Sequence, residues 1–128
     1  MYLKKLVLDT NFLMVPGQLG VDIFAELKRA ADFPFEIYTT SGNVLELEKL
    51  KKEAKKRDKT AANIALGLIK AKNLKIIQIE RDKDIDSSLV ELANAGYIIA
   101  TADKGLQKRL DSYIFLRQKK FIEFKGVL

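Results

Sequence analysis

The sequence predicts an α/β protein in which helices cover both faces of a mainly parallel central sheet, a three-layer α/β/α sandwich. Two observations predict this class. Apolar, β-rich segments alternate along the 128 residues with segments whose apolar residues recur at helical spacing. Residues 6–8 and 97–101 are almost entirely apolar, as expected of strands that are buried on both faces of a parallel sheet.

The first quarter of the chain predicts one strand and one helix. The apolar run of residues 6–13 is expected in the middle of the sheet, and it is interrupted by the small polar residues Asp9, Thr10 and Asn11. A loop rich in Pro and Gly is expected at residues 15–20. Apolar residues at helical spacing then predict a helix over residues 23–31.

Two consecutive helices are expected between the second and third strands. Residues 35–40 alternate and are β-rich, so they predict the second strand, and residues 41–43 turn the chain. One apolar stripe runs from Val44 to Ala54. A new helix cap at residues 59–60 precedes a second stripe over residues 61–69.

The second half of the chain continues the alternation. The third strand is expected at residues 74–79, and a charged loop separates it from a helix over residues 85–93 that Gly96 ends. Residues 97–101 form a central strand, and residues 106–110 a short helix.

The last two apolar segments, residues 114–116 and 121–124, are expected to complete the sheet, with one of them at its edge. No repeat or low-complexity linker interrupts this order of elements. Residues 1–128 are therefore assigned to a single domain.

Composition limits the chemistry. The chain has no Cys and no His, which excludes disulfides, thiolate nucleophiles and the commonest general base and transition-metal ligand. Hydrolytic chemistry would then use carboxylates with hard cations. The start of the chain has no signal-peptide pattern, and no apolar run is long enough to span a membrane. We therefore expect a soluble, cytoplasmic protein without a membrane partner.

The net charge of +6 is unevenly distributed. Residues 49–59 hold seven Lys/Arg against two acidic residues, and residues 104–128 hold the same numbers, which leaves nine basic against thirteen acidic residues elsewhere. Two basic stretches around an acidic remainder are typical of a protein that binds a polyanion. A solvated helix face explains residues 49–59 equally well.

Four carboxylates stand at strand ends or helix starts. Parallel strands end at one edge of the sheet, where such proteins bind ligands, so we expect these groups to lie close together. Mg²⁺ or Mn²⁺ would remove the repulsion between them, generate a hydroxide nucleophile and stabilise the leaving oxygen of a phosphodiester. The candidate catalytic residues and metal ligands are Asp9, Glu46, Asp86 and Asp103, with Thr10, Asn11 and Thr101 orienting ligands or waters.

Each carboxylate also has a purely structural explanation. Asp9 is able to accept backbone N–H bonds in its own turn. Asn43 and Glu46 have the spacing of a capping box. Asp86 lies in the first turn of a helix, where the dipole favours a negative charge, and Asp103 is a good N-cap.

Four blocks of the sequence together match the motifs of one family. The chain resembles the PIN-domain nucleases over nearly its whole length, most closely the small stand-alone archaeal proteins that are likened to eukaryotic pre-ribosomal-RNA endonucleases, and more distantly VapC toxins. The blocks are Asp9-Thr10-Asn11 after an apolar strand, Glu46-Leu47-Glu48-Lys49-Leu50 opening a helix, Asp86 before Leu89, and Thr101-Ala102-Asp103-Lys104-Gly105-Leu106.

The resemblance implies a metal-dependent endoribonuclease that is directed at single-stranded RNA. Its acidic ligands map onto the four carboxylates named above. Asp82 and Asp84 compete with Asp86 for one position, and Glu48 competes with Glu46, although the family's Glu-Leu-x-x-Leu pattern favours Glu46.

The resemblance also bears on partners. It implies RNA as substrate, in rRNA processing or as the target of a VapC-type toxin, and it admits a homodimer and an antitoxin or ribosome-assembly partner. The alternative of another class is an RNA-binding scaffold with negligible turnover. The basic residues expected to contact RNA phosphates are Lys49, Lys52, Lys55, Lys56 and Lys104.

Overall fold

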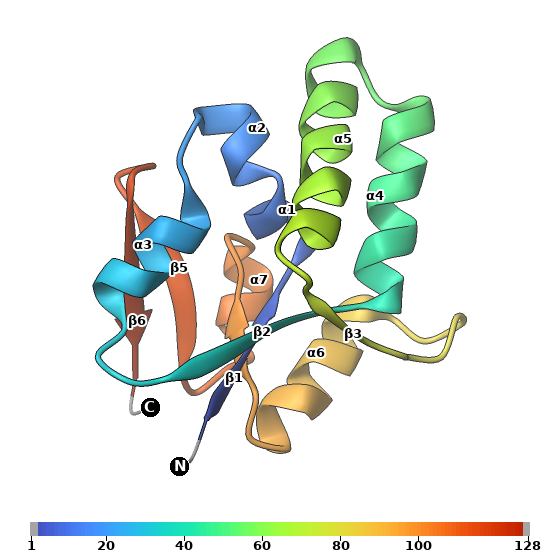
Figure 1. Cartoon of the computed structure of the whole chain (residues 1–128). Coiled ribbons are helices and arrows are strands. Elements are labelled where there is room, and N and C mark those ends of the chain that lie inside the picture. Colours follow the sequence, from blue (N-terminus) through green and yellow to red (C-terminus); the bar gives the residue numbers. More distant parts are fainter. Residues whose placement is uncertain (1–2, 127–128) are drawn as a thin grey trace.

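The computed structural model describes residues 3–126 and has the predicted α/β architecture, with a mainly parallel sheet of six strands (Figure 1). The strand order is β3-β2-β1-β4-β5-β6, and only the last pair, β5 and β6, is antiparallel. The strands are β1 (Lys4–Leu8), β2 (Phe35–Thr40), β3 (Lys75–Ile77), β4 (Ile98–Ala100), β5 (Tyr113–Arg117) and β6 (Phe121–Lys125).

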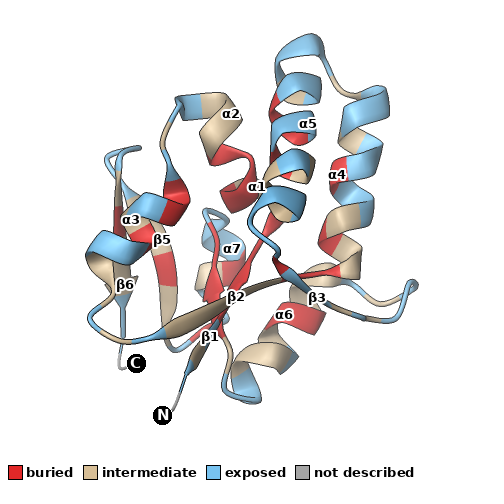
Figure 2. Cartoon of the chain, in the orientation of Figure 1, coloured by how far each residue is buried: buried red, intermediate tan, exposed pale blue. Residues whose placement is uncertain are grey.

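Helices pack on both faces of the sheet and form two separate apolar cores. Leu6 and Leu8 of β1 face the core beneath the first five helices, whereas Val7 faces the core beneath the last two. Figure 2 shows the buried residues concentrated on β1, β4 and the inner sides of the helices. The helices are α1 (Thr10–Leu13), α2 (Val15–Leu19), α3 (Ile23–Ala30), α4 (Ser41–Glu53), α5 (Lys56–Ala71), α6 (Ile85–Asn94) and α7 (Lys104–Gln107).

The segment predicted as a Pro/Gly loop, residues 15–20, is helix α2 over most of its length, so that prediction is wrong. Pro16 lies in the first turn, where a missing N–H costs nothing. Gly17 lets α2 approach α5, because a Cβ at Gly17 would lie 2.5 Å from the Cα of Ala61. Gly20 ends the helix with a φ of 68°.

Several predicted boundaries also need correction. The first strand ends at Leu8, and the remaining apolar residues of that run, Phe12 and Leu13, are buried in helix α1. The expected turn at residues 41–43 is instead the first turn of α4. Helix α5 begins at Lys56, before the predicted cap, and β3 is shorter than predicted at both ends.

The sheet has its topological switch point at β1. The chain leaves β1 and pairs β2 on one side, and β4 later pairs with β1 on the other side. Ligand crevices in such sheets lie at the carboxyl ends of the strands where the order reverses. Asp9 and Thr101 directly follow β1 and β4, and they therefore stand at this position.

Within residues 3–126, no helix is both long enough and apolar enough to cross a membrane.

Candidate active site at the carboxyl edge of the sheet

Asp9 is buried and is held by donors from three parts of the chain. One carboxylate oxygen, Oδ1, accepts the backbone N–H of Thr10 at 2.8 Å and the amide Nδ2 of Asn43 at 2.9 Å. The other, Oδ2, accepts the hydroxyl of Thr101 at 2.8 Å. The side chain is only 5% exposed. Asp9 thus caps helix α1, as its structural explanation predicts, and also has its carboxylate fixed from the ends of β2 and β4.

Asn43, the residue that reaches Asp9 from the first turn of α4, was not predicted as part of the site. Its fully buried amide also donates to the hydroxyl of Thr10 at 2.9 Å, and its oxygen accepts the hydroxyl of Thr40 at 2.7 Å. The backbone N–H of Asn43 donates to the Thr40 hydroxyl at 3.1 Å, so Thr40 is the N-cap of α4. The capping box that offered a structural explanation for Glu46 is therefore absent, because Thr40 and not Asn43 is the N-cap.

The three residues predicted to orient ligands connect the loops that follow β1 and β4. Thr10 and Thr101 contact the Asp9 network directly. The side-chain oxygen of Asn11 accepts the backbone N–H of Ala102 at 3.0 Å, and the Thr101 hydroxyl accepts the backbone N–H of Asp103 at 3.1 Å. These bonds fix the loop that carries Asp103 against the end of β1.

The structure brings the four predicted carboxylates to one cavity of about 390 Å³. Asp9 is buried at its base, Asp86 is half-buried, and Glu46 and Asp103 are exposed. They come from the end of β1, the first turn of α6, the first half of α4 and the start of α7. The expected clustering at one edge of the sheet is thus present.

The carboxylates influence one another electrostatically. Burial raises the pKa of Asp9 above its ordinary value, the hydrogen bonds from Thr101, Thr10 and Asn43 oppose this rise, and the charge of Asp86 adds to it. The pKa of Asp86 is also raised, first by burial and then by the charges of Asp103, Asp84 and Glu46, although Arg109 opposes the rise. The cavity therefore concentrates negative charge in the absence of a cation.

The structure separates the competing residues in part. Glu48 lines a different cavity from Glu46, and Asp82 does not line the carboxylate cavity. Asp84 does line it, but its carboxylate accepts the backbone N–H and the hydroxyl of Ser87 at 3.0 and 2.9 Å as the N-cap of α6. These hydrogen bonds lower the pKa of Asp84.

Asp103 is the N-cap of α7, as its structural explanation predicts. Its Oδ1 accepts the backbone N–H groups of Gly105 at 2.8 Å and Leu106 at 3.4 Å. Both bonds use the same carboxylate oxygen. Capping and a place beside the cavity are therefore compatible in this residue.

The donors at this cavity suit a hard divalent cation, because they are carboxylate and amide oxygens in a chain without Cys or His. As the side chains stand, no three acidic groups among residues 3–126 are close enough together to hold one ion. The chemistry of the donor set fits Mg²⁺ or Mn²⁺.

The predicted RNA-contacting lysines lie in three places. Lys49 lines a cavity that also includes Glu46, and Lys104 is the first residue of α7, beside Asp103. Lys52, Lys55 and Lys56 are exposed where α4 passes into α5, at the end of the helical hairpin that points away from the sheet (Figure 1).

The mainly parallel sheet and the carboxylates at its edge are the features of a PIN-type protein. A family described as "PIN like domain" matches residues 6–119, and the chain belongs to this family. The resemblance inferred from the sequence motifs is thereby confirmed.

Two curated relatives cover most of the chain. It is 34% identical over 132 residues to Ribonuclease VapC4 of Methanocaldococcus jannaschii, covering 97% of this chain and 98% of the relative. It is 32% identical over 105 residues to Ribonuclease VapC9 of Archaeoglobus fulgidus, covering 80% of this chain and 73% of that protein. Among solved structures, the PIN domain endonuclease Utp24 matches with a TM-score of 0.78 at 20% identity, over 97% of this chain and 92% of that chain, which shows a shared fold.

Proposed function

We propose that this protein is a metal-dependent endoribonuclease that hydrolyses phosphodiester bonds of single-stranded RNA. The observation that carries the proposal is the cavity where Asp9, Glu46, Asp86 and Asp103 meet at the switch point of the sheet. Two relatives that bear the name ribonuclease support it, since the chain matches VapC4 over nearly the whole length of both proteins.

The four carboxylates would hold Mg²⁺ or Mn²⁺. When bound, the cation activates the attacking water and stabilises the leaving oxygen of the phosphodiester. Asp9 is the fixed ligand, because Asn43 and Thr101 hold both of its oxygens. Glu46 and Asp103 are more exposed, and the cap of α7 uses only Oδ1 of Asp103, so Oδ2 of Asp103 and the Glu46 carboxylate would complete the set of ligands.

The biological role that we propose first is that of a VapC-type toxin with an antitoxin partner, because both curated relatives bear the VapC name. RNA processing is the second role that we propose. The likeness to the endonuclease Utp24 supports a common fold and does not favour this role over the first. A small reading frame encoding an antitoxin beside the gene would favour the first role.

The test is single-turnover cleavage of a single-stranded RNA in Mn²⁺ by the wild type, Asp9→Asn and Asp86→Asn. Each variant removes an anionic oxygen from the cavity, so cleavage should fall by orders of magnitude. Asp32→Asn, which changes an exposed acidic residue between α3 and β2, is the matched control and should cleave normally. RNA binding without any metal-dependent cleavage by the wild type would instead identify an RNA-binding scaffold.

A further inference from the structure

The carboxylate cavity is one end of a longer groove. It shares Glu46 and Ile85 with a second cavity of about 270 Å³, which lies beside the first turns of α4. The second cavity in turn shares Ser41, Leu45, Ile79 and Arg81 with a third of about 780 Å³. The three cavities therefore lie side by side along α4, and we call this row of cavities the α4 groove.

The middle of the α4 groove is closely packed. The hydroxyl of Ser41 accepts the backbone N–H of Ile79 at 2.9 Å, which ties the start of α4 to the segment after β3. A Cβ at Gly42 would lie 2.7 Å from the side chain of Ile79 and 3.1 Å from that of Ile85. Glycine at this position therefore lets α4 approach that segment, and the wall of the groove is built by the fold itself.

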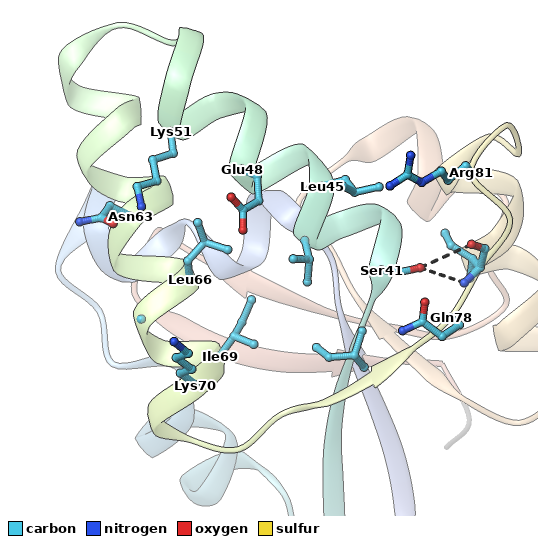
Figure 3. Close-up of a pocket in the computed structure, with 14 residues that line it drawn as sticks. Ser41, Leu45, Glu48, Lys51, Asn63, Leu66, Ile69, Lys70, Gln78 and Arg81 are labelled. Carbon is cyan, nitrogen blue, oxygen red and sulfur yellow. Dashed lines mark hydrogen bonds between the residues drawn. The ribbon is translucent and has the colours of Figure 1, made fainter.

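The far end of the α4 groove has a lining of mixed chemistry (Figure 3). Its floor is aliphatic, and two of its side chains, Leu45 and Ile76, are 47% and 38% exposed. The lining also includes two carboxamides at opposite ends, Asn63 beside Lys51 and Gln78 near Ser41 (Figure 3). Three basic side chains surround it against one acidic side chain, Glu48, and they are Lys51, Lys70 and Arg81.

We propose that the α4 groove binds the stretch of single-stranded RNA that leaves the cleavage site, and that its far end holds an unstacked base. This inference rests on the proposed function. Lys49, on the second cavity, and Arg81, where the second and third cavities meet, are placed to contact successive phosphates. The aliphatic floor packs against the base, and the Gln78 carboxamide offers both a donor and an acceptor to its edge.

Two features favour RNA over an acidic amphipathic peptide. A strand that is cleaved at the carboxylates must continue in some direction, and the next cavity along α4 adjoins the carboxylate cavity at Glu46 and Ile85. The excess of basic groups increases along the groove, away from the carboxylates, so a polyanion is bound where the acidic cluster no longer repels it.

Gly67 provides the sharpest variant. It lines the far end of the α4 groove in the middle of α5, and a Cβ added there meets nothing within 4 Å. Gly67→Leu therefore adds a bulky side chain at the lining of the α4 groove. Leu also has a higher helix propensity than Gly, so the fold should tolerate the change. Ala25→Leu is the matched control, since it places the same side chain at an exposed position on α3.

The probe is a fluorescent, unstructured RNA of about twelve nucleotides, whose binding is measured in chelator so that no cleavage is needed. Gly67→Leu should weaken binding about tenfold, the loss expected when one base contact is removed, and Ala25→Leu should not. The double variant Lys70→Ala/Arg81→Ala should lower the slope of log K against log salt by about one to two, in proportion to the phosphates released.

A second arm uses 4-thiouridine at single positions of the same RNA, and the photo-crosslinks are mapped to peptides. Crosslinks from positions beyond the scissile bond to residues 63–81 support the inference. If Gly67→Leu and Ala25→Leu bind the RNA equally well and the crosslinks map elsewhere, the inference about the α4 groove is overturned. The proposed function stands in that case as long as the wild type cleaves RNA. Wild type that binds but never cleaves overturns the proposed function alone. If RNA binding is unchanged by Gly67→Leu but an acidic peptide binds the α4 groove, the groove is a site for a protein partner, and the inference is overturned.

Discussion

Asp9 combines burial with full hydrogen bonding, and this combination explains how a carboxylate is tolerated at the end of an apolar strand. An isolated buried charge is costly, but each oxygen of Asp9 has at least one donor. The donors belong to the residues that follow β1, β2 and β4, so correct orientation of Asp9 depends on assembly of the sheet. Within this set, Asn43 also binds the hydroxyls of Thr10 and Thr40.

Replacing Asn43 with Ala should destabilise the folded protein by about 1–3 kcal/mol, because Asp9 and Thr10 lose a buried partner. Denaturant unfolding in chelator measures this. Asn94→Ala, at an exposed position at the end of α6, is the control and should change stability little. If the two variants proved equally stable, the Asn43 amide would not support Asp9.

Asp103 and Glu46 allow capping to be separated from catalysis. Asp103→Asn keeps the cap of α7, because Asn caps as well as Asp, and it relieves repulsion on Asp86. Stability without metal should therefore stay level or rise, whereas cleavage in Mn²⁺ should fall by orders of magnitude.

Glu46→Gln is expected to behave in the same way for a different reason. Glu46 is exposed and takes no part in capping α4, and its charge raises the pKa of Asp86, so stability without metal should stay level or rise slightly, but Gln is a poor ligand for Mg²⁺. Glu53→Gln, on the same helix, is the control. Full activity in both Asp103→Asn and Glu46→Gln, with melts in chelator unchanged, would contradict the four-carboxylate site.

At the scale of elements, α4 organises the site because its residues serve different purposes at successive turns. Asn43 is buried against Asp9, Glu46 faces the carboxylate cavity, and Lys49 lines the second cavity of the α4 groove. These residues are spaced three apart, so they lie on neighbouring positions of the helix surface. Leu47 on the inner side anchors the helix to the core.

The lysines at the α4–α5 hairpin test how far the RNA-binding surface extends. Lys52→Ala/Lys55→Ala/Lys56→Ala should weaken RNA binding and flatten its salt dependence, as fewer counterions are released. A titration over a range of salt concentrations, beside the same series for Lys28→Ala on α3, measures the slope. An unchanged slope would mean that the hairpin is a solvated helix face and that contacts are confined to the α4 groove.

Elements with a strong apolar period could be predicted from the sequence, whereas elements defined by close contact could not. Helices α3 to α6 follow apolar stripes. Helix α2 was predicted as a loop because it contains Pro16 and Gly17, and the reason for Gly17, its close approach to Ala61, is visible only in the folded structure. The four carboxylates could be predicted because parallel strands end at one edge. Asn43 could not, since nothing local indicates a bond to a residue 34 positions earlier.

At the scale of the whole molecule, five of the 17 acidic residues line the cavity where the sheet order reverses, and no Lys or Arg among the described residues lines it. The raised pKa values of Asp9 and Asp86 mean that the ionised form of each carboxyl is less favourable in this cavity than in water. A carboxyl whose pKa is higher in the folded than in the unfolded state binds more protons when folded. Its contribution to stability therefore falls as the pH rises from about 4 through the raised pKa. A divalent cation should reverse this loss.

We therefore expect Asp86→Asn to be more stable than the wild type in chelator at neutral pH. The difference should shrink as the pH falls through the raised pKa of Asp86 towards about 4, below which the wild-type carboxyl is protonated in both states. Saturating Mn²⁺ should raise the Tm of the wild type and raise that of the variant less, because binding to the folded state alone stabilises it. Thermal melts across pH, with and without Mn²⁺, measure both effects. Asp32→Asn should follow the wild type throughout, and a Tm insensitive to Mn²⁺ in every variant would argue against a cation site at this cavity.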